Sequence, residues 1–513
     1  MFAGSDLTVK AGALIDNRGD MLARGNLALR VLDNTRVSPL QVNNQGTGLM
    51  QALGAFTLGT DAERWVNFTQ TQDAAVLADS INLKAVGVDN DGLMQAATTL
   101  TALGLNALEN RGFGSLLAGT TMAVGAGTLG NQGTLQAQDG MRLTAGTLVN
   151  KSGTIISSTT RAEGEPVDAA AIAGHIMAGT LVNEFDALIQ SGGDLHITAR
   201  DVLTNSQSTL LAEGDLHIKA QHTDTTLAIR NSGDAVLQAG GHLTIEGHTV
   251  DGVTGHNTVL SEQTGSILGQ SVAIQAQSLI NTGKIQSDEA LTVNLLGTLE
   301  NWGDMLALGT MGLSATQVDN LADMGQQGHI QANAGLSLDA QSLTNQGTMT
   351  TAVGLHNSRI SVDAFSNAST GVIQSVGGEG ISQLALNVGS SFTNEGSLIT
   401  ESNLEIQNST AGRALAVNNL GLIQAGYGLR MGTTSQMDLN NGEGATVLAI
   451  IGQITTGNLL NRGDIDGTTL TVNTAGLNNF GLISAARALN ITASDLFNRA
   501  GGVIQNATAN ADF

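Results

Sequence analysis

Residues 129–155, LGNQGTLQAQDGMRLTAGTLVNKSGTI, contain one complete unit of a repeat and the beginning of the next. A Leu precedes Asn131 by two residues, and Gly133 follows that Asn by two. An apolar residue returns at Leu135, and the same order of residue types begins again at Leu148. Alternation of apolar and polar residues over runs of three to five positions is typical of short strands with one buried face. The stretch therefore predicts a series of short β-strands separated by tight turns.

The same unit recurs along almost the whole chain. Between Asn90 and Asn150 the repeated asparagines are spaced by 20, 21 and 19 residues, and elsewhere the spacing reaches 22–27 residues. One coil of this size cannot bury its apolar face alone, so successive coils must stack, with each strand pairing with its equivalent in the next coil. We therefore expect an all-β fold. It is a parallel β-helix (a solenoid) of about 20–24 coils at roughly 4.8 Å per coil, an elongated rod on the order of 100 Å long.

The repeated asparagines are predicted to form a column at the turns. Asn tolerates a left-handed backbone, the Gly that follows accepts a positive φ, and stacked amides can hydrogen-bond from one coil to the next. The clearest members of this turn ladder are Asn90, Asn110, Asn131, Asn150, Asn281, Asn301, Asn345, Asn461 and Asn479. We assign these residues a structural role rather than a catalytic one.

The composition supports a repetitive β-rich body and excludes several other classes. The 513 residues include 66 Gly but only 2 Pro, 10 Phe, 2 Trp, 1 Tyr and no Cys, which excludes disulfides and Cys-ligated metals. A chain that is 41% hydrophobic and 13% charged is too apolar to be disordered. Its net charge of −23 leaves no basic surface for nucleic acid. No apolar run approaches the roughly 20 residues of a membrane-spanning helix. The N-terminus also lacks the features of a signal peptide, so we expect any export signal to lie outside this sequence.

Three stretches interrupt the repeat: residues 61–73, 159–173 and 246–265. Insertions in a solenoid emerge on its surface, where they can bind partners. Apart from these irregular loops, we expect residues 1–513 to form a single β-helical segment.

The units at residues 129–155 and 279–305 (LINTGKIQSDEALTVNLLGTLENWGDM) resemble the haemagglutinin repeat. Filamentous haemagglutinins carry this repeat, as do HecA-type adhesins and the exoproteins of contact-dependent growth inhibition. The resemblance extends from about Ile15 to Ile504. It implies a right-handed β-helix of a Gram-negative bacterium, exported by two-partner secretion through an outer-membrane transporter, secreted and displayed at the cell surface.

The resemblance implies two functions for such a segment. One is adhesion to a receptor on a host or neighbouring cell, carried by the three interrupting loops, and the other is presentation of a C-terminal toxin. The sequence shows neither the secretion domain nor the toxin module of these exoproteins, so we expect a segment of a larger protein. A passive spacer in a contact-dependent inhibition toxin is the alternative.

Two Arg-Gly-Asp triplets are candidate binding motifs for an integrin, which reads the two charges of an exposed triplet. They are Arg18-Gly19-Asp20 and Arg462-Gly463-Asp464. The repeat already places Gly two residues after Asn, so Arg and Asp need only flank it by chance.

Two histidines occupy near-identical contexts. His196 and His217 are 21 residues apart, and we expect them to stack on the outer face of adjacent coils. With Asp194 and Asp215 nearby, a weak transition-metal site is the alternative to a solvated polar pair. We prefer the polar pair and expect no metal.

An enzyme acting on polysaccharides, a lyase or a hydrolase, is the alternative function from another class. Such a β-helical enzyme needs converging carboxylates on adjacent coils. The closest acidic residues in the sequence, Asp304, Asp319 and Asp323, have no Lys nearby. We therefore expect no enzymatic activity and no cofactor.

Overall fold

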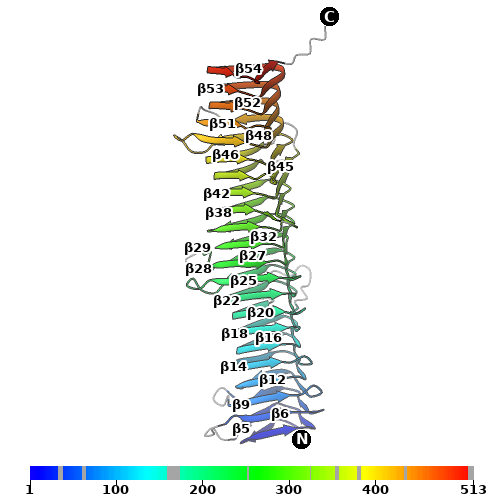
Figure 1. The fold of residues 1–513 in the computed structure, drawn as a ribbon. Helices are drawn as coiled ribbons and strands as arrows, with labels where there is room; N and C mark the ends of the chain where they lie inside the picture. Colours follow the sequence, from blue (N-terminus) through cyan, green and yellow to red (C-terminus); the bar gives the residue numbers. More distant parts are fainter. Residues whose placement is uncertain are drawn as a thin grey trace. The chain divides into compact units, whose positions relative to one another are not determined.

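The computed structural model describes residues 1–32, 38–60, 65–158, 174–250, 253–323, 325–352, 357–377, 383–432 and 436–506. Residue contacts divide the chain into two compact units, Met1–Gln270 (unit 1) and Ser271–Phe513 (unit 2). Each unit is a stack of parallel strands (Figure 1), and the described parts of the chain contain strands and turns but no helix. Together the described coils make about 21 turns. The prediction of an all-β parallel β-helix is confirmed.

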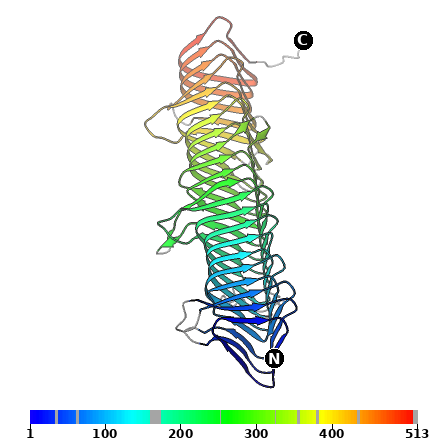
Figure 2. The same ribbon diagram turned by 60° about the horizontal axis from the view of Figure 1, so that its bottom comes forward.

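One coil of unit 1 shows how the repeat folds. The coil begins with β16 (Thr121–Asn131), which bends around a corner, and continues with the short strand β17 (Thr134–Ala137). The next coil repeats this order with β18 (Gly140–Lys151) and β19 (Thr154–Ser157). β16 pairs with β18, and β17 with β19, in parallel. Residues of one type therefore stack from coil to coil, and Figure 2 shows the equivalent strands stacked within each unit.

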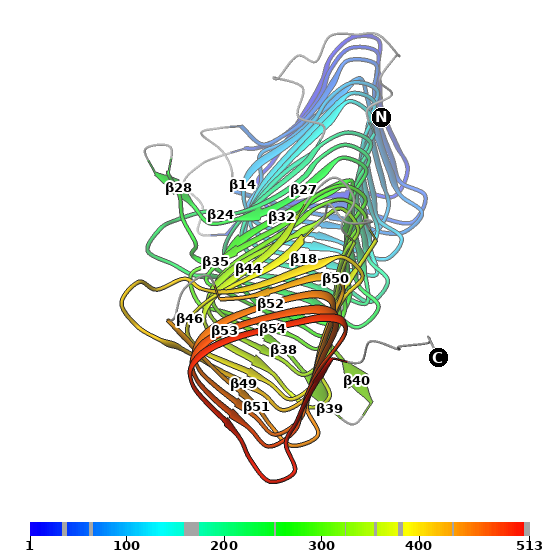
Figure 3. The same ribbon diagram turned by 90° about the horizontal axis from the view of Figure 1, so that it is seen from above.

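Unit 2 has its most regular coils near residues 446–498. Here β52 (Thr446–Asn461), β53 (Asp464–Asn479) and β54 (Leu482–Asn498) each run through an entire coil. Thr446 pairs with Asp464, and Asn461 pairs with Asn479, so the register holds from the first residue of the coil to the last. Figure 3 shows these strands lying over one another when unit 2 is seen along its stack.

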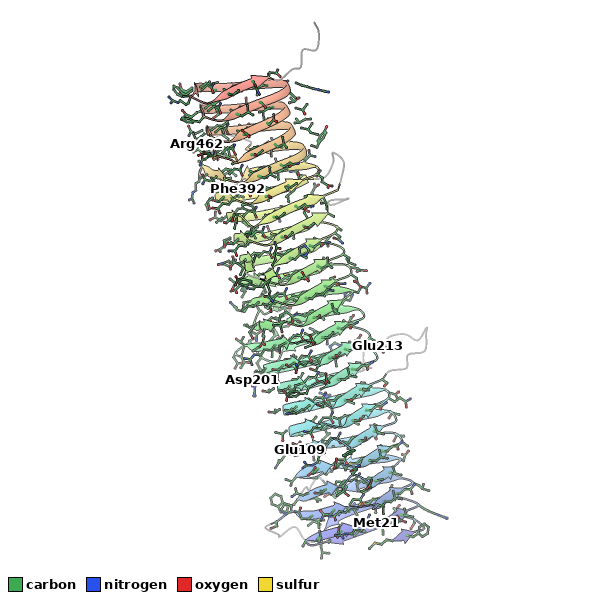
Figure 4. The ribbon with its side chains drawn as sticks, turned by 45° about the vertical axis from the view of Figure 1, so that its right-hand side comes forward. Met21, Glu109, Asp201, Glu213, Phe392 and Arg462 are labelled. Carbon is green, nitrogen blue, oxygen red and sulfur yellow. The ribbon has the colours of Figure 1, made fainter. Side chains whose placement is uncertain are left out.

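The core of each unit consists of aliphatic columns that point inward. In β16, Met122, Val124 and Leu129 are each 1% exposed, and alternate residues face outward. Burial of such a side chain stabilises the fold by roughly 1.5–3 kcal/mol. Aromatic residues are few, but in unit 2 Phe365 and Phe392 stack with parallel rings whose centroids are 4.5 Å apart (Figure 4).

The three interruptions differ from the prediction in part. In the stretch 61–73, residues 61–64 lie outside the described residues, but β9 (Val66–Gln70) is a regular strand of the coil. Phe68 within it is 1% exposed and belongs to the core, whereas Trp65, just before the strand, is exposed. The irregular loop expected across 61–73 is therefore wrong for Val66–Gln70. The stretch 159–173 lies entirely outside the described residues.

The stretch 246–265 contains one true projection and one coil strand. β28 (Thr249–Val250) and β29 (Val253–Thr254) form a separate two-stranded antiparallel sheet. β30 (Thr258–Gln263) then rejoins the solenoid by pairing with β25 (Leu227–Ser232). A second antiparallel pair, β39 (Ala322–Asp323) and β40 (Gln326–Gln327), leaves unit 2 at a point where no insertion was predicted.

Candidate functional site

The most regular polar feature of both units is a buried column of side-chain amides. All of the asparagines predicted for the turn ladder lie in it. The column in unit 1 comprises Asn17, Asn44, Gln70, Asn90, Asn110, Asn131, Asn150, Asn183, Asn205, Asn231 and Gln263. The column in unit 2 comprises Asn281, Asn301, Asn320, Asn345, Asn367, Asn394, Asn419, Asn441, Asn461, Asn479 and Asn498. Each amide lies at the last or the next-to-last residue of a strand and, except for the exposed Asn498, is buried inside the coil.

The amides form a hydrogen-bonded chain with one direction. Nδ2 of Asn131 donates to Oδ1 of Asn150 at 2.7 Å, and Nδ2 of Asn150 donates to Oδ1 of Asn183 at 2.8 Å. The second N–H group of each amide is shared with backbone carbonyls, as when Asn110 donates to the carbonyl of Gly114 at 3.0 Å. In unit 2 every Nδ2···Oδ1 distance from Asn281 to Asn498 is 2.8 Å. Aligned hydrogen bonds of this kind polarise one another inside a low-dielectric interior.

The backbone reason given for the Asn-x-Gly turns needs correction. Among the described residues, no asparagine of the column has a positive φ. The second residue after the amide is left-handed only in some coils, as at Gly46 (φ 58°) and Phe185 (φ 60°). In most coils the Gly is needed for space instead. A Cβ at Gly133 would lie 2.0 Å from the carbonyl oxygen of Gly114 in the preceding coil, and one at Gly463 would lie 2.1 Å from that of Ala445.

Some members of the column lack the Gly and were therefore not predicted. They are Gln70, Asn183, Asn205, Asn320 and Asn367, while Gln263 is followed by Gly265 but is not an asparagine. For most of them a second signal was available in the sequence, because an aliphatic or Phe residue precedes the amide by two positions, as Leu181 and Phe365 do.

Carboxylates at another corner connect the coils through the backbone. Oδ1 of Asp194 accepts the backbone N–H of Asp215 at 2.9 Å, and Oδ1 of Asp215 accepts that of His242 at 2.7 Å. The preceding glycine leaves room for this bond, since a Cβ at Gly214 would lie 2.3 Å from Asp194 Oδ1. These carboxylates were predicted only as alternative metal ligands, and their hydrogen bonds to the backbone of the next coil were not predicted. The repeated Gly-Asp-Leu sequence at both positions was the available signal.

The histidine pair is part of a longer column. His175 on β20 (Gly174–Glu184) is in register with His196 on β22 (Leu195–Ser206), which is in register with His217 on β24 (Leu216–Ala220). The ring centroids of His196 and His217 are 5.7 Å apart. Nε2 of His217 lies 2.9 Å from Oε1 of Glu246. His175 was not predicted as a member of this column, because its coil follows the interruption at 159–173.

Burial lowers the pKa of two histidines in this column. Desolvation lowers the pKa of His175, and the positive charge of Arg142 and the neighbouring His196 lower it further. Desolvation also lowers the pKa of His196, with a second contribution from His217, while Asp194 and Asp215 oppose the shift. Both rings are thus held toward the neutral form. Over the described residues no group of three His, Asp or Glu side chains is placed to hold a metal ion.

The Arg-Gly-Asp triplets lie in tight turns between strands. Arg18 is exposed and pairs with Asp16 at 3.2 Å, in the turn between β3 (Leu14–Asn17) and β4 (Asp20–Ala23). Arg462 is also exposed (Figure 4), with its guanidinium carbon 5.8 Å from the ring centroid of Phe480. Gly463 is buried against the preceding coil, whereas Arg462 and Asp464 on either side of it are exposed. The second triplet therefore lies flat on the surface of its coil and does not project from it. Integrin binding stays the alternative to a chance occurrence of the two triplets.

The acidic residues singled out in the sequence lie on different elements. Asp304 begins β37 (Asp304–Ala307) and lies 3.8 Å from Nδ1 of His329. Asp319, on β38 (Met311–Asn320), accepts a hydrogen bond from Gln317, and Asp323 belongs to β39.

The described residues contain no helix long and apolar enough to cross a membrane.

Comparison with curated proteins gives several long matches. A toxin CdiA of Escherichia coli is 25% identical over an aligned length of 516 residues, which covers 92% of this chain and 15% of that protein. A deoxyribonuclease CdiA of Dickeya dadantii strain 3937 is 27% identical over 404 residues, covering 72% of this chain and 11% of that protein. The homologues of this chain are CdiA exoproteins. They belong to the two-partner secretion family and act in contact-dependent growth inhibition, consistent with a haemagglutinin-like repeat region.

A third CdiA protein shows the same relation. A tRNA nuclease CdiA of Escherichia coli O6:K15:H31 strain 536 is 26% identical over 464 residues, covering 77% of this chain and 13% of that protein. The chain therefore spans 11% to 15% of the length of these CdiA proteins. No protein-family model matches the chain. No solved structure matches it either.

Proposed function

We propose that the chain is a structural stalk segment of a contact-dependent growth inhibition exoprotein. In this proposal an outer-membrane two-partner secretion transporter exports the protein, which is then displayed at the surface of the producing cell. The stalk either adheres to a receptor on a host or neighbouring cell or holds a C-terminal toxin at a distance from the producer. In this proposal the nuclease activities named for CdiA homologues reside in their C-terminal toxin domains, and the stalk carries none of them.

The observation that carries the proposal is the stacking of equivalent strands and amides from coil to coil within each unit. A coil is joined to the next by parallel backbone ladders, as in the ten register pairs from Thr121–Gly140 to Asn131–Asn150. The amide column adds a buried bond per coil, such as that between Asn110 and Asn131 at 2.8 Å. A force along the stack therefore acts on several ladders at once. Such an arrangement suits a stiff support better than a flexible linker.

A pair of deletions in the producing bacterium tests the proposal. Removing residues 111–131 excises one coil and joins Asn110 to Gln132, so both the amide column and the strand register are restored. Removing residues 121–131 excises only part of a coil and breaks the register. The readouts are accessibility of the chain to proteinase K on intact cells and growth inhibition of neighbouring susceptible cells in co-culture.

We expect the in-register deletion to retain surface exposure and most of the inhibition, and the partial-coil deletion to lose both. Two results would overturn the proposal. One is a wild-type chain that stays protected from protease in intact cells, and the other is an in-register deletion as defective as the partial-coil deletion.

A further inference from the structure

Unit 2 carries a hollow in its outer surface that the stalk function does not use. The hollow has a volume of about 300 Å³ and is lined by side chains from β46 (Gln383–Asn394), β48 (Asn403–Asn408), β50 (Leu422–Met431) and β52. We call it the Tyr427 groove, because Tyr427 lies at its edge.

An exposed aromatic ring and an aliphatic side chain form one wall of the Tyr427 groove. Tyr427 is the only tyrosine in the sequence, and it is 45% exposed. Ile451, on the next coil, is also 45% exposed and lines the same hollow. A tyrosine exposes a flat apolar face and a polar hydroxyl, and both are available to a ligand without any change in the coil. Pyranose rings present a face of C–H groups that packs against such a ring.

The charged and amide side chains that line the Tyr427 groove are electrically balanced. Glu405 and Arg430 are register partners on β48 and β50, and Oε1 of Glu405 lies 3.5 Å from Nη1 of Arg430. Glu405 also accepts a hydrogen bond from the Nε2 group of Gln383. Gln453 is the register partner of Arg430 on β52 and lines the hollow as well. Donors and acceptors thus lie side by side with no net charge. Hydroxyl groups, which both donate and accept, match this arrangement better than an ion does.

Gly428 accounts for the depth of the groove. It lies in β50 between Asn403 of the preceding coil and Ile451 of the following coil. Because glycine has no side chain, the space between the side chains of these two residues stays open. A Cβ at Gly428 would lie 2.5 Å from Oδ1 of Asn403, so an added methyl group would enter the hollow and displace that amide. The volume is at the lower end of the range for small-molecule sites, which suits one or two sugar residues.

We propose that the Tyr427 groove binds one or two residues of a neutral oligosaccharide. The pyranose face packs on Tyr427 and Ile451, and the sugar hydroxyls bond to the groups around Glu405, Arg430 and Gln453. The glycan-binding proposal gives the proposed stalk a class of ligand. It rests on the proposed function only for the place where binding would occur, the surface of the producing cell. Binding itself is measurable with the purified chain.

The test begins with the purified full chain on an array of neutral, sialylated and sulfated glycans. The neutral glycan that binds best is then titrated against variants by calorimetry. Tyr427→Ala removes the stacking face, and we expect the affinity to fall about tenfold. Gly428→Ala fills the hollow, and we expect a loss of similar size. Phe480→Ala is the matched control, because it removes another exposed aromatic residue of unit 2, outside the groove.

Each outcome decides the proposal. Binding of neutral glycans that Tyr427→Ala and Gly428→Ala weaken and Phe480→Ala does not would support it. Absence of binding on the array, binding of sialylated or sulfated glycans alone, or wild-type affinity in both groove variants would overturn it. Circular dichroism of each variant confirms that the coils are intact. Because surface display is measured separately by protease accessibility, failure of glycan binding leaves the stalk proposal standing.

Discussion

Replacement of Asn131 by Leu is expected to destabilise the coils on either side of it. The side chain of Asn131 is 1% exposed, donates to Oδ1 of Asn150 at 2.7 Å and accepts from Nδ2 of Asn110 at 2.8 Å. Leu has a similar volume, so the loss comes from hydrogen bonding rather than from a cavity. Oδ1 of Asn150 loses its amide donor and Asn110 loses an acceptor, at about 1–3 kcal/mol for each buried group. Since Asn110 keeps its bond to the carbonyl of Gly114, we expect a total of about 2–4 kcal/mol.

Two further substitutions at Asn131 separate hydrogen bonding from other effects. Asn131→Gln keeps the amide, and the column already accommodates Gln263 at 3.0 Å from Asn231, so we expect a smaller loss than for Leu. Asn131→Asp keeps the volume but places a carboxylate oxygen against Oδ1 of Asn150 and nearby backbone carbonyls. Because a buried unpaired charge is costly, the Asp variant should be the least stable at neutral pH and recover part of its stability in acid.

The measurement is hydrogen exchange of residues 129–155 in the full chain, supported by urea unfolding. Exchange is preferred because solenoids unfold through neighbouring units, so a single melting temperature does not locate the damage. The expected order of protection at neutral pH is wild type, Gln, Leu and then Asp. Equal protection in the wild type and the Leu variant would refute the reasoning, as would an Asp variant as stable as Gln at neutral pH.

Three other predictions concern different parts of the chain. Gly133→Ala should lower the free energy of unfolding in urea by about 1–3 kcal/mol, because its Cβ would lie 2.0 Å from the Gly114 carbonyl oxygen. Gly112→Ala, in the adjacent turn, is the control and should be neutral, because a Cβ there has no atom within 4 Å. Equal effects of the two substitutions would contradict the close-approach explanation. The lowered pKa values of His175 and His196 mean that the unfolded chain binds protons first as the pH falls, so β20, β22 and β24 should lose protection below the ordinary value of 6.5. Comparison of exchange at about pH 7.5 and pH 5.5 should show this loss, and His196→Gln should reduce it; a pH response unchanged by that substitution would argue against the histidine column. Finally, the double variant Asp20→Ala and Asp464→Ala should leave attachment of integrin-bearing cells unchanged, because both triplets follow tight turns of the solenoid, and reduced attachment would show that the triplets are read.

Periodicity alone was sufficient to predict the fold class. Apolar residues recur two positions before each Asn and four positions after it, as at Leu135. This pattern determines which residues face inward, and equivalent strands must then stack to bury them. The amide column could be predicted for the same reason, since a polar residue that recurs in register with the core must meet its own copies. The turn glycines were harder. Whether Gly133 serves a left-handed backbone or a close approach depends on the distance between coils, which a sequence does not contain.

Two features were not predicted from the sequence, for different reasons. His175 precedes His196 by 21 residues, the same spacing as between His196 and His217, but its coil follows the interruption at 159–173. The Tyr427 groove depends on a small residue, Gly428, lying in register with large ones on neighbouring strands. Since the spacing of the repeat varies, such neighbours cannot be aligned by counting residues. Interruption of the repeat was also an imperfect guide to loops, because Phe68, within the stretch 61–73, is a core residue of β9.

The common direction of the amide chain has a consequence for how such proteins change length. Each described amide pair donates from the earlier coil to the later one, as Asn461 does to Asn479. The column therefore has a polarity, and two stacks can be joined head to tail but not head to head, where like groups would meet. Recombination that duplicates or removes a whole coil recreates the same donor and acceptor at the new junction. A gene built from such coils can thus lengthen or shorten its product without leaving a mismatched amide inside it.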